Sequence, residues 1–172
     1  TCALPICTIL INSFSKSYAM TGWRVGYAAG PEQFISNITK LQENVAACAA
    51  MPSQYAALEA LQGTQEFSTQ MVESYRQRRD YIVDAVNQIP GMSCRKPRGT
   101  FYIFINISGL GMTSEQFAYA LLEKKHVVVV PGTAFGASGE GYIRMSCATS
   151  FEDIQTGMEL IRAFVAEITA CR

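Results

Sequence analysis

Residues 8–31, TILINSFSKSYAMTGWRVGYAAGP, carry the most information about the fold and chemistry of this chain. Lys16 lies among serines, soon after the apolar run at 8–11, which predicts a short buried strand that is central in a parallel sheet. Open α/β proteins place reactive groups where strands end, so this position favours a functional lysine. A neutral lysine amine is a nucleophile toward carbonyl groups.

A second cation, Arg24, follows in the same stretch. It comes directly after Gly22 and Trp23, and we expect its guanidinium to be packed rather than free. A fixed guanidinium can bind a phosphate through two parallel hydrogen bonds. Ser13 and Ser15 can add hydroxyl donors to the same anion. The segment therefore suits a lysine that forms a Schiff base with an aldehyde cofactor carrying a phosphate.

The composition predicts a folded protein without a strongly charged surface. Of 172 residues, 49% are hydrophobic and 16% are charged, so a substantial core is expected. The 14 basic and 14 acidic side chains argue against nucleic-acid or anionic-membrane partners. No apolar run approaches the ~20 residues of a membrane span. With no signal-peptide pattern, we expect a cytoplasmic location.

Cysteine and histidine do not predict a metal site. The 6 cysteines are scattered without a C-x-x-C pair, which favours small buried side chains in a reduced protein. His126 has no cysteine at ligand spacing and is expected at the boundary of an element. Arg76, Arg78 and Arg79 form the longest basic cluster, expected on the solvated face of a helix.

Periodicity along the chain predicts an α/β or α+β architecture. Further strands are expected at 23–29, 101–105, 127–130 and 142–147, and helices at 31–45, 53–61, 67–89, 113–122 and 150–168. Thr113 and Gln116 have the spacing of a capping box. The best boundary lies at Gly63-Thr64, so we expect two domains, residues 1–63 and 64–172.

The motif around Lys16 resembles the cofactor segment of the class I/II aminotransferases, a fold-type-I family that uses pyridoxal 5'-phosphate. In that family the lysine of S-x-S-K forms the Schiff base and then moves a proton between substrate and cofactor. The resemblance implies that Lys16 is this lysine and that Ser13 and Arg24 bind the phosphate. Ser15 belongs to the same motif, and the similarity continues through residues 26–31.

A second motif lies far downstream. Residues 130–136, VPGTAFG, and 141–146, GYIRMS, are similar to the family's P-G-x-x-F-G and G-x-x-R segments. Strand alternation places Tyr142, Arg144 and Ser146 on one face. An unpaired buried arginine is costly, so Arg144 needs a partner. The local sequence favours a structural carboxylate, whereas the resemblance implies the α-carboxylate of an amino-acid substrate.

The resemblance implies the C-terminal part of a fold-type-I enzyme. This part comprises the end of the large parallel-sheet domain and a small α+β domain. Residues 98–102, RGTFY, are similar to a P-x-G-x-F-Y strand of the family, and we expect their aromatic rings in the core. Family members carry a long region before the lysine, with the aspartate that pairs with the cofactor's pyridine nitrogen. We therefore expect a fragment that is inactive by itself. In it the strand at 8–11 should lack its neighbours, and the helices at 34–45 and 53–61 should lack part of the surface that they cover in the family.

The function implied is transfer of an amino group between an amino acid and a 2-oxo acid, with a homodimer as the full-length enzyme. One alternative keeps the cofactor but makes the protein a C–S lyase or another fold-type-I enzyme. A second alternative is a non-catalytic effector domain or a pseudo-enzyme. The motifs around Lys16 and Arg144 do not separate these functions, and they do not identify the substrate pair.

Overall fold

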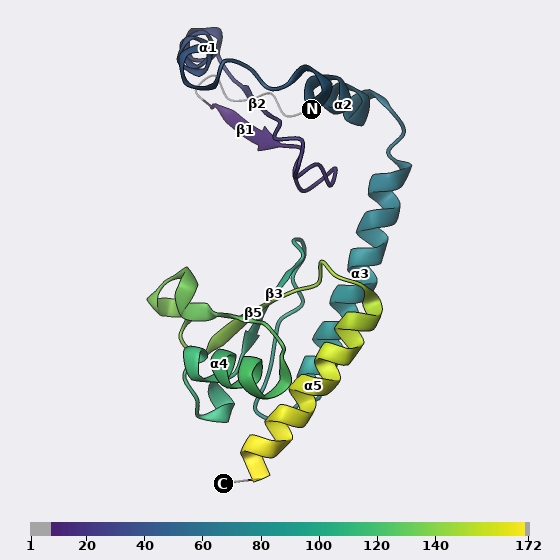
Figure 1. Cartoon of the computed structure of the whole chain (residues 1–172), viewed down its shortest axis with the longest axis vertical. Helices are drawn as coiled ribbons and strands as arrows, with labels where there is room; N and C mark the ends of the chain where they lie inside the picture. Colours follow the sequence, from purple (N-terminus) through teal and green to yellow (C-terminus); the bar gives the residue numbers. More distant parts are fainter. Residues whose placement is uncertain (1–7, 171–172) are drawn as a thin grey trace. The chain divides into compact units, whose positions relative to one another are not determined.

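The structure is a computed structural model that describes residues 8–170. It forms two compact units, one up to Gln70 and the other from Met71 onward (Figure 1). The helix α3 (Glu66–Asn87) runs across this division. The domain limits at 63–64 stay a prediction.

The first unit contains an antiparallel hairpin and two helices. Strand β1 (Leu10–Ser13) pairs with β2 (Gly26–Ala29). The helices α1 (Glu32–Ala46) and α2 (Met51–Gln62) follow. Helix α2 begins two residues earlier than predicted, because Pro52 lies in its first turn, where no helical N–H is required.

The strand β1 differs from its prediction of a buried, central, parallel strand. Within residues 8–170 it pairs only with β2, and that pairing is antiparallel. All four residues of β1 are exposed, and Ile11 keeps 79% of its surface accessible. A central parallel strand needs neighbours on both edges and a layer on each face, and the described residues supply neither to β1.

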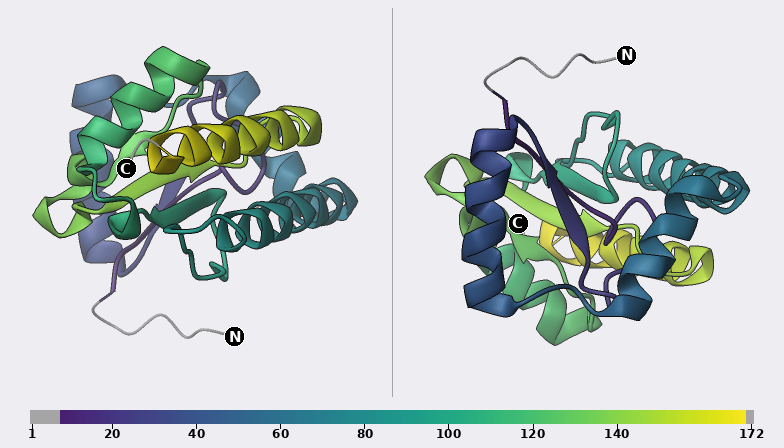
Figure 2. Two further views of the ribbon diagram at one scale, coloured as in Figure 1. Left: turned by 90° about the horizontal axis from the view of Figure 1, so that it is seen from below. Right: turned by 90° about the horizontal axis from the view of Figure 1, so that it is seen from above.

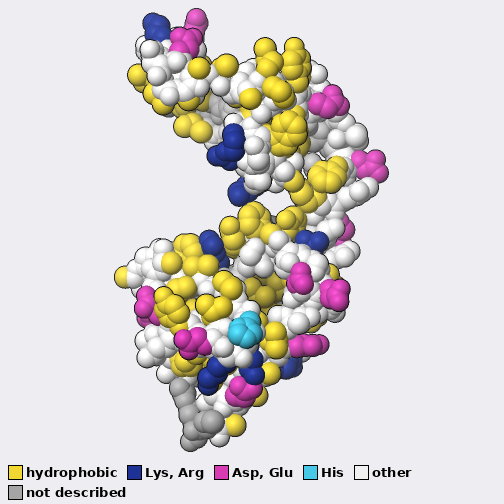
Figure 3. Space-filling model, in the orientation of Figure 1, with side chains coloured by type: hydrophobic (Ala, Val, Ile, Leu, Met, Phe, Trp, Pro, Cys, Tyr) yellow, Lys and Arg dark blue, Asp and Glu magenta, His cyan; other side chains and the backbone are white. Residues whose placement is uncertain are grey.

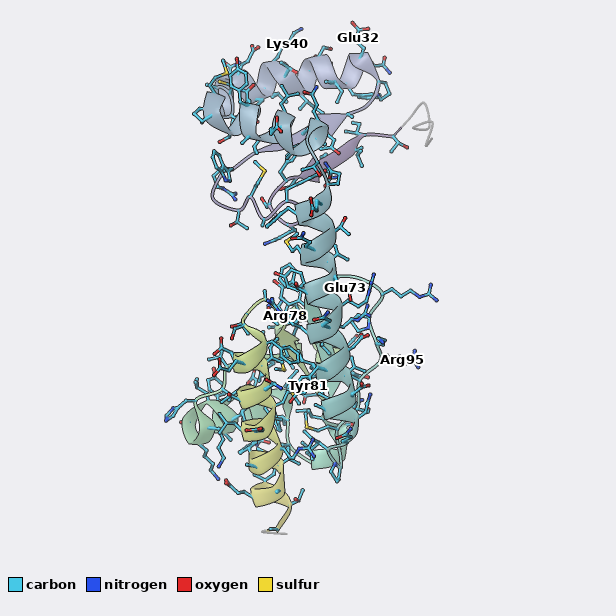
Figure 4. All side chains as sticks on the ribbon, turned by 90° about the vertical axis from the view of Figure 1, so that its right-hand side faces the viewer. Glu32, Lys40, Glu73, Arg78, Tyr81 and Arg95 are labelled. Atoms are coloured by element: carbon cyan, nitrogen blue, oxygen red, sulfur yellow. The ribbon has the colours of Figure 1, made fainter. Side chains whose placement is uncertain are left out.

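Helix α1 has the predicted apolar spacing but buries none of its residues. Leu41 and Val45 are 68% and 81% exposed. Apolar side chains accordingly appear on the surface of this unit (Figure 3). Glu32 and Lys40 point away from β1 and β2 (Figure 4). The helix therefore exposes both a polar face and an apolar face.

The second unit is built on a three-stranded antiparallel sheet. Its strand order is β3 (Tyr102–Asn106), β5 (Tyr142–Ser146) and β4 (Val130–Pro131). Three helices, α3, α4 (Ser114–Lys125) and α5 (Phe151–Ala170), contribute buried residues to one core with the sheet. Helices α4 and α5 lie side by side (Figure 2), and the rings of Phe117 and Phe164 meet edge to face at 5.3 Å.

Alternation along β3 and β5 separates a buried face of the sheet from an open face. Ile103, Ile105 and Ile143 are at most 1% exposed. The predicted stripes of α3 and α5 meet this face, and their buried members are Ile82, Val86, Ile89, Ile154, Met158, Ile161 and Val165. Each fully buried aliphatic side chain contributes about 1.5–3 kcal/mol. Phe67, also predicted inward, is 63% exposed.

The region after α4 contains less strand than predicted. Only Val130 and Pro131 pair, with Arg144 and Ile143 of β5, whereas residues 127–129 are irregular. Proline has no N–H to donate, so β4 is a short edge strand. The predicted capping box is confirmed: the Gln116 amide donates to the Thr113 hydroxyl, and the Thr113 amide donates to the Gln116 side chain.

Candidate functional site

Lys16 lies on a tight turn that leaves β1. The amides of Tyr18 and Met20 both donate to the carbonyl of Phe14, at 3.3 and 3.4 Å, and the amide of Ala19 donates to the carbonyl of Lys16. Phe14 is only 4% exposed. It belongs to a small core with Met20, Val25 and Ala57. This core anchors the turn while the Lys16 side chain remains exposed.

The structure brings the Ser13 and Ser15 hydroxyls together. The Ser13 hydroxyl donates to the Ser15 hydroxyl at 2.9 Å and accepts from the Ser15 amide at 3.0 Å. The Asn12 side chain accepts from the Ser13 amide at 2.8 Å. Hydroxyl hydrogens rotate to suit their partners, so this pair can redirect its donors toward a bound anion.

Arg24 is exposed, so the prediction that it is packed was wrong. Its Nη1 donates to the carbonyl of Thr21 at 2.9 Å, and its backbone has φ 49°. No carboxylate among residues 8–170 forms an ion pair with it. One backbone contact therefore restrains the guanidinium, and its charge is not neutralised by a carboxylate of the described chain.

A close approach of the two strands lies beside these groups. A Cβ on Gly26 would lie 2.6 Å from the carbonyl oxygen of Asn12, a distance that real Cβ atoms do not reach. Glycine thus allows β2 to pair with β1 two residues after Arg24 and next to Ser13.

The donors of this segment fit a ligand with a phosphate and a carbonyl group. Ser13 and Ser15 offer hydroxyls, Arg24 offers a planar guanidinium, and Lys16 offers an amine. No acidic residue occurs from residue 12 to residue 27. An anion bound here would meet no carboxylate from the segment itself.

Arg144 lies on the open face of the second unit's sheet. It is half-buried on β5, between the buried residues Ile143 and Met145, as alternation predicts. Its Cζ lies 4.0 Å from the centre of the Tyr102 ring and 4.5 Å from that of Phe135. Tyr102 therefore faces Arg144, which corrects the expectation that it belongs to the core.

Arg144 forms no structural salt bridge within the described part of the chain. Arg144 lines an open hollow of about 890 Å³ on the second unit, together with Tyr102, Phe104 and Tyr142. Arg95, from the loop before β3, also lines this hollow and is labelled in Figure 4.

A hydrogen-bonded lock holds the start of β5. The buried Ser114 hydroxyl accepts from the amides of Gly141 and Tyr142, at 2.9 and 3.2 Å. The Glu140 carboxylate accepts from the amides of Ser114 and Gly141, at 2.8 and 3.0 Å. These backbone donors, Ser114 first, lower the pKa of Glu140. The lock fixes the chain just before Arg144, and sequence reasoning missed it because its partners are far apart in the chain.

Two glycines shape the loop that carries Phe135. The loop contains the 3₁₀ turns η2 (Gly132–Phe135) and η3 (Ala137–Gly139). A Cβ on Gly132 would lie 2.1 Å from the Gly139 carbonyl oxygen, and one on Gly139 would lie 2.0 Å from that of Gly132. Only glycine permits this approach, which explains both residues in physical terms.

Cysteine and histidine have no site role in the described structure. Within residues 8–170 no three histidine, cysteine or acidic side chains could hold a metal ion together. Cys48 is exposed, contrary to expectation, whereas burial raises the pKa of both Cys94 and Cys147. Cys2, Cys7 and Cys171 lie outside the described residues. His126, at φ 57°, caps the end of α4, as its predicted boundary position requires, and is exposed (Figure 3).

The basic cluster on α3 is occupied by contacts within the unit. Arg76 pairs with Glu73, Arg79 pairs with Asp80, and Arg78 lies over the Tyr75 ring at 5.4 Å. Figure 4 labels Glu73 and Arg78 on this helix. All three arginines thus have partners on their own helix, and the cluster does not require an external anion.

Comparison with known proteins decides the family. The family model described as aminotransferase class I and II matches residues 4–161. The chain belongs to this family. It is 47% identical to an aspartate aminotransferase of Pyrococcus horikoshii, over 91% of this chain and 41% of that protein. It is 43% identical to an aspartate aminotransferase of Musicola paradisiaca, over 95% of this chain and 41% of that protein.

The solved structures agree with the fold class. The chain matches the crystal structure of an aromatic aminotransferase from Pyrococcus horikoshii with a TM-score of 0.88 and 40% identity, over 93% of this chain and 43% of that one. The predicted α/β fold of the C-terminal part of a fold-type-I aminotransferase is confirmed. The chain spans about two fifths of the length of these relatives. No helix in residues 8–170 is long and apolar enough to cross a membrane.

Proposed function

We propose that this chain is the C-terminal part of a pyridoxal-phosphate-dependent aminotransferase. The full-length enzyme would move an amino group from an amino acid to a 2-oxo acid. The observation that carries this proposal is the turn that presents Lys16 beside the Ser13–Ser15 hydroxyl pair, with Arg24 on the same segment. Because the chain spans about two fifths of its relatives, we propose that it is inactive by itself.

Four residues of the segment have assigned roles in this proposal. Ser13, Ser15 and Arg24 bind the cofactor phosphate, which fits the absence of acidic residues from 12 to 27. The Lys16 amine would hold the cofactor's carbonyl carbon, and once the substrate's amine displaces it, the free amine would accept the proton that leaves the substrate's α-carbon. When bound, pyridoxal phosphate supplies the electron sink for the electron pair of the substrate's Cα–H bond.

Arg144 has a separate role in substrate binding. Its N–H groups bind the α-carboxylate through two hydrogen bonds, and this contact orients the Cα–H bond for proton removal. Orientation of this kind lowers the barrier without a covalent bond between Arg144 and the substrate. Family resemblance further supports a homodimer as the state of the full-length enzyme, for which we propose a cytoplasmic location.

The test uses the full-length protein that contains this chain. Lys16→Ala is expected to abolish transamination of an amino-acid panel and to remove the visible absorbance of covalently held pyridoxal phosphate. Lys40→Ala is the matched control, because Lys40 is an exposed lysine of α1 in the same unit. Full activity of Lys16→Ala would refute the assigned role.

Product analysis separates the alternatives. An aminotransferase needs a 2-oxo acid acceptor and forms a new amino acid, whereas a C–S lyase releases ammonia and pyruvate without an acceptor. A non-catalytic effector or pseudo-enzyme would turn over neither substrate. Ammonia release at full rate without an acceptor would replace the proposed reaction with the lyase reaction.

A further inference from the structure

We propose that Tyr102 and Phe135 are positioning residues for binding of the substrate carboxylate. Their rings hold the faces of the Arg144 guanidinium and leave its N–H edge open to the ligand. This inference rests on the proposed role of Arg144. It adds the contacts by which the second unit holds the guanidinium with its N–H edge open.

The contacts of Arg144 are unusual for a half-buried cation. Its Cζ lies over two rings, at 4.0 Å from the Tyr102 centre and 4.5 Å from the Phe135 centre. No hydrogen bond or ion pair joins the guanidinium to another residue of the described chain. No described side-chain nitrogen or oxygen is both fully buried and unpaired. The N–H groups of Arg144 therefore reach accessible space, and the residue lines the open hollow of its unit.

Ring faces and carboxylates stabilise a guanidinium in different places. A carboxylate binds along the planar N–H edge through two hydrogen bonds and neutralises the charge. An aromatic ring attracts the cation from above its plane, through the negative face of the ring. The two rings can therefore offset the partial burial of Arg144 while its donors stay available for a second, charged partner.

The Phe135 ring contacts a neighbouring aromatic pair. Phe104 is the cross-strand partner of Arg144 in the sheet. Its ring stacks on Tyr142 at 5.2 Å with an interplanar angle of 17°, and it meets Phe135 edge to face at 6.1 Å. Phe135 nevertheless remains 52% exposed. Its position is thus explained by contact with Arg144 better than by burial in a core.

The first experiment measures steady-state kinetics of the full-length enzyme. Tyr102→Leu and Phe135→Leu are each expected to raise KM for the amino-acid substrate about tenfold, with a smaller change in kcat. Tyr102→Phe retains the ring face and is expected to restore most of the lost affinity. Tyr119→Leu is the matched control, because Tyr119 is an exposed tyrosine of α4 without an arginine contact in the described structure.

A second substrate separates positioning from structural damage. An amine that lacks the carboxylate cannot use Arg144, so its half-reaction should be equally fast in the leucine variants and the unmodified enzyme. An equal loss with both substrates would overturn the inference. Arg144→Lys tests the underlying function. If it raises KM and the leucine variants do not, the ring contacts are irrelevant; if it leaves KM unchanged, the proposed role of Arg144 itself fails.

A third measurement needs no activity. In NMR spectra of the 172-residue chain, ring currents should shift the Arg144 Nε–H proton upfield, and Tyr102→Leu should remove much of this shift. Tyr102→Phe should keep it. An unshifted Arg144 proton in the unmodified chain would overturn the proposed contact, independently of whether the full-length protein is an aminotransferase.

Discussion

Replacement of Ser114 by alanine should weaken the start of β5 by a calculable amount. The Ser114 hydroxyl accepts from the Gly141 and Tyr142 amides at 2.9 and 3.2 Å, and the residue is 0% exposed. In Ser114→Ala, Gly141 keeps its bond to Glu140 at 3.0 Å, whereas the Tyr142 amide loses its acceptor and the Gly139 carbonyl oxygen loses the hydroxyl that donates to it at 3.3 Å. An unsatisfied buried donor costs about 1–3 kcal/mol. We therefore expect a loss of about 2 kcal/mol in the free energy of unfolding.

Urea unfolding and thermal melting of the chain provide the assay. For a chain of this size, the loss corresponds to a drop in Tm of about 4–8 °C. Amide hydrogen exchange at Tyr142 should accelerate in the variant, because local opening of β5 becomes easier. Ser138→Ala is the control, since Ser138 is an exposed serine of the same loop. A Tm within about 1 °C of the unmodified chain, with unchanged exchange at Tyr142, would refute this reasoning.

Two further predictions concern the same loop. The pKa of Glu140 is lowered in the folded state, so its stabilising effect is present at neutral pH and is lost as pH falls through the folded-state pKa. The free energy of unfolding in urea should therefore differ between the unmodified chain and Glu140→Gln at neutral pH, and this difference should shrink on acidification. A difference that stays constant with pH would contradict the prediction. Gly132→Ala should strongly destabilise the fold, because its Cβ would lie 2.1 Å from the Gly139 carbonyl oxygen. A Cβ added at Gly157, in α5, would meet nothing within 4 Å, so Gly157→Ala should instead stabilise the helix by about 0.5–1 kcal/mol. A comparable loss of stability in Gly132→Ala and Gly157→Ala would exclude the steric explanation.

Features that depend on near neighbours were predictable from the sequence. The capping box of α4 joins residues three positions apart, and the stripes of α3 and α5 follow from helical spacing alone. Element boundaries were less accurate. Val127 to Val129 have the composition of a strand but remain unpaired, because β4 has only a two-residue pairing with β5.

Features that depend on distant partners were not predictable from local patterns. The apolar pattern alone predicts a buried β1, whereas the expectation that this strand lacks its neighbours came from the resemblance and agrees with its exposure within residues 8–170. Arg24 was expected to be packed, yet it is exposed, and its guanidinium donates to the backbone carbonyl of Thr21. Residue identity therefore named the groups of the candidate site but did not predict how Arg24 is held.

The sequence by itself determined the chemical groups of the candidate site and the family of the chain. Lys16, its two serines and Arg24 lie within a dozen residues of each other, so their spacing along the chain already brings the amine, hydroxyls and guanidinium into one segment. Only the tertiary structure decided the partners of Arg144. Its two rings come from β3 and from the loop before β5, and the Ser114 lock joins residues 26 to 28 positions apart. Such contacts follow from strand register and loop packing, which no local pattern specifies.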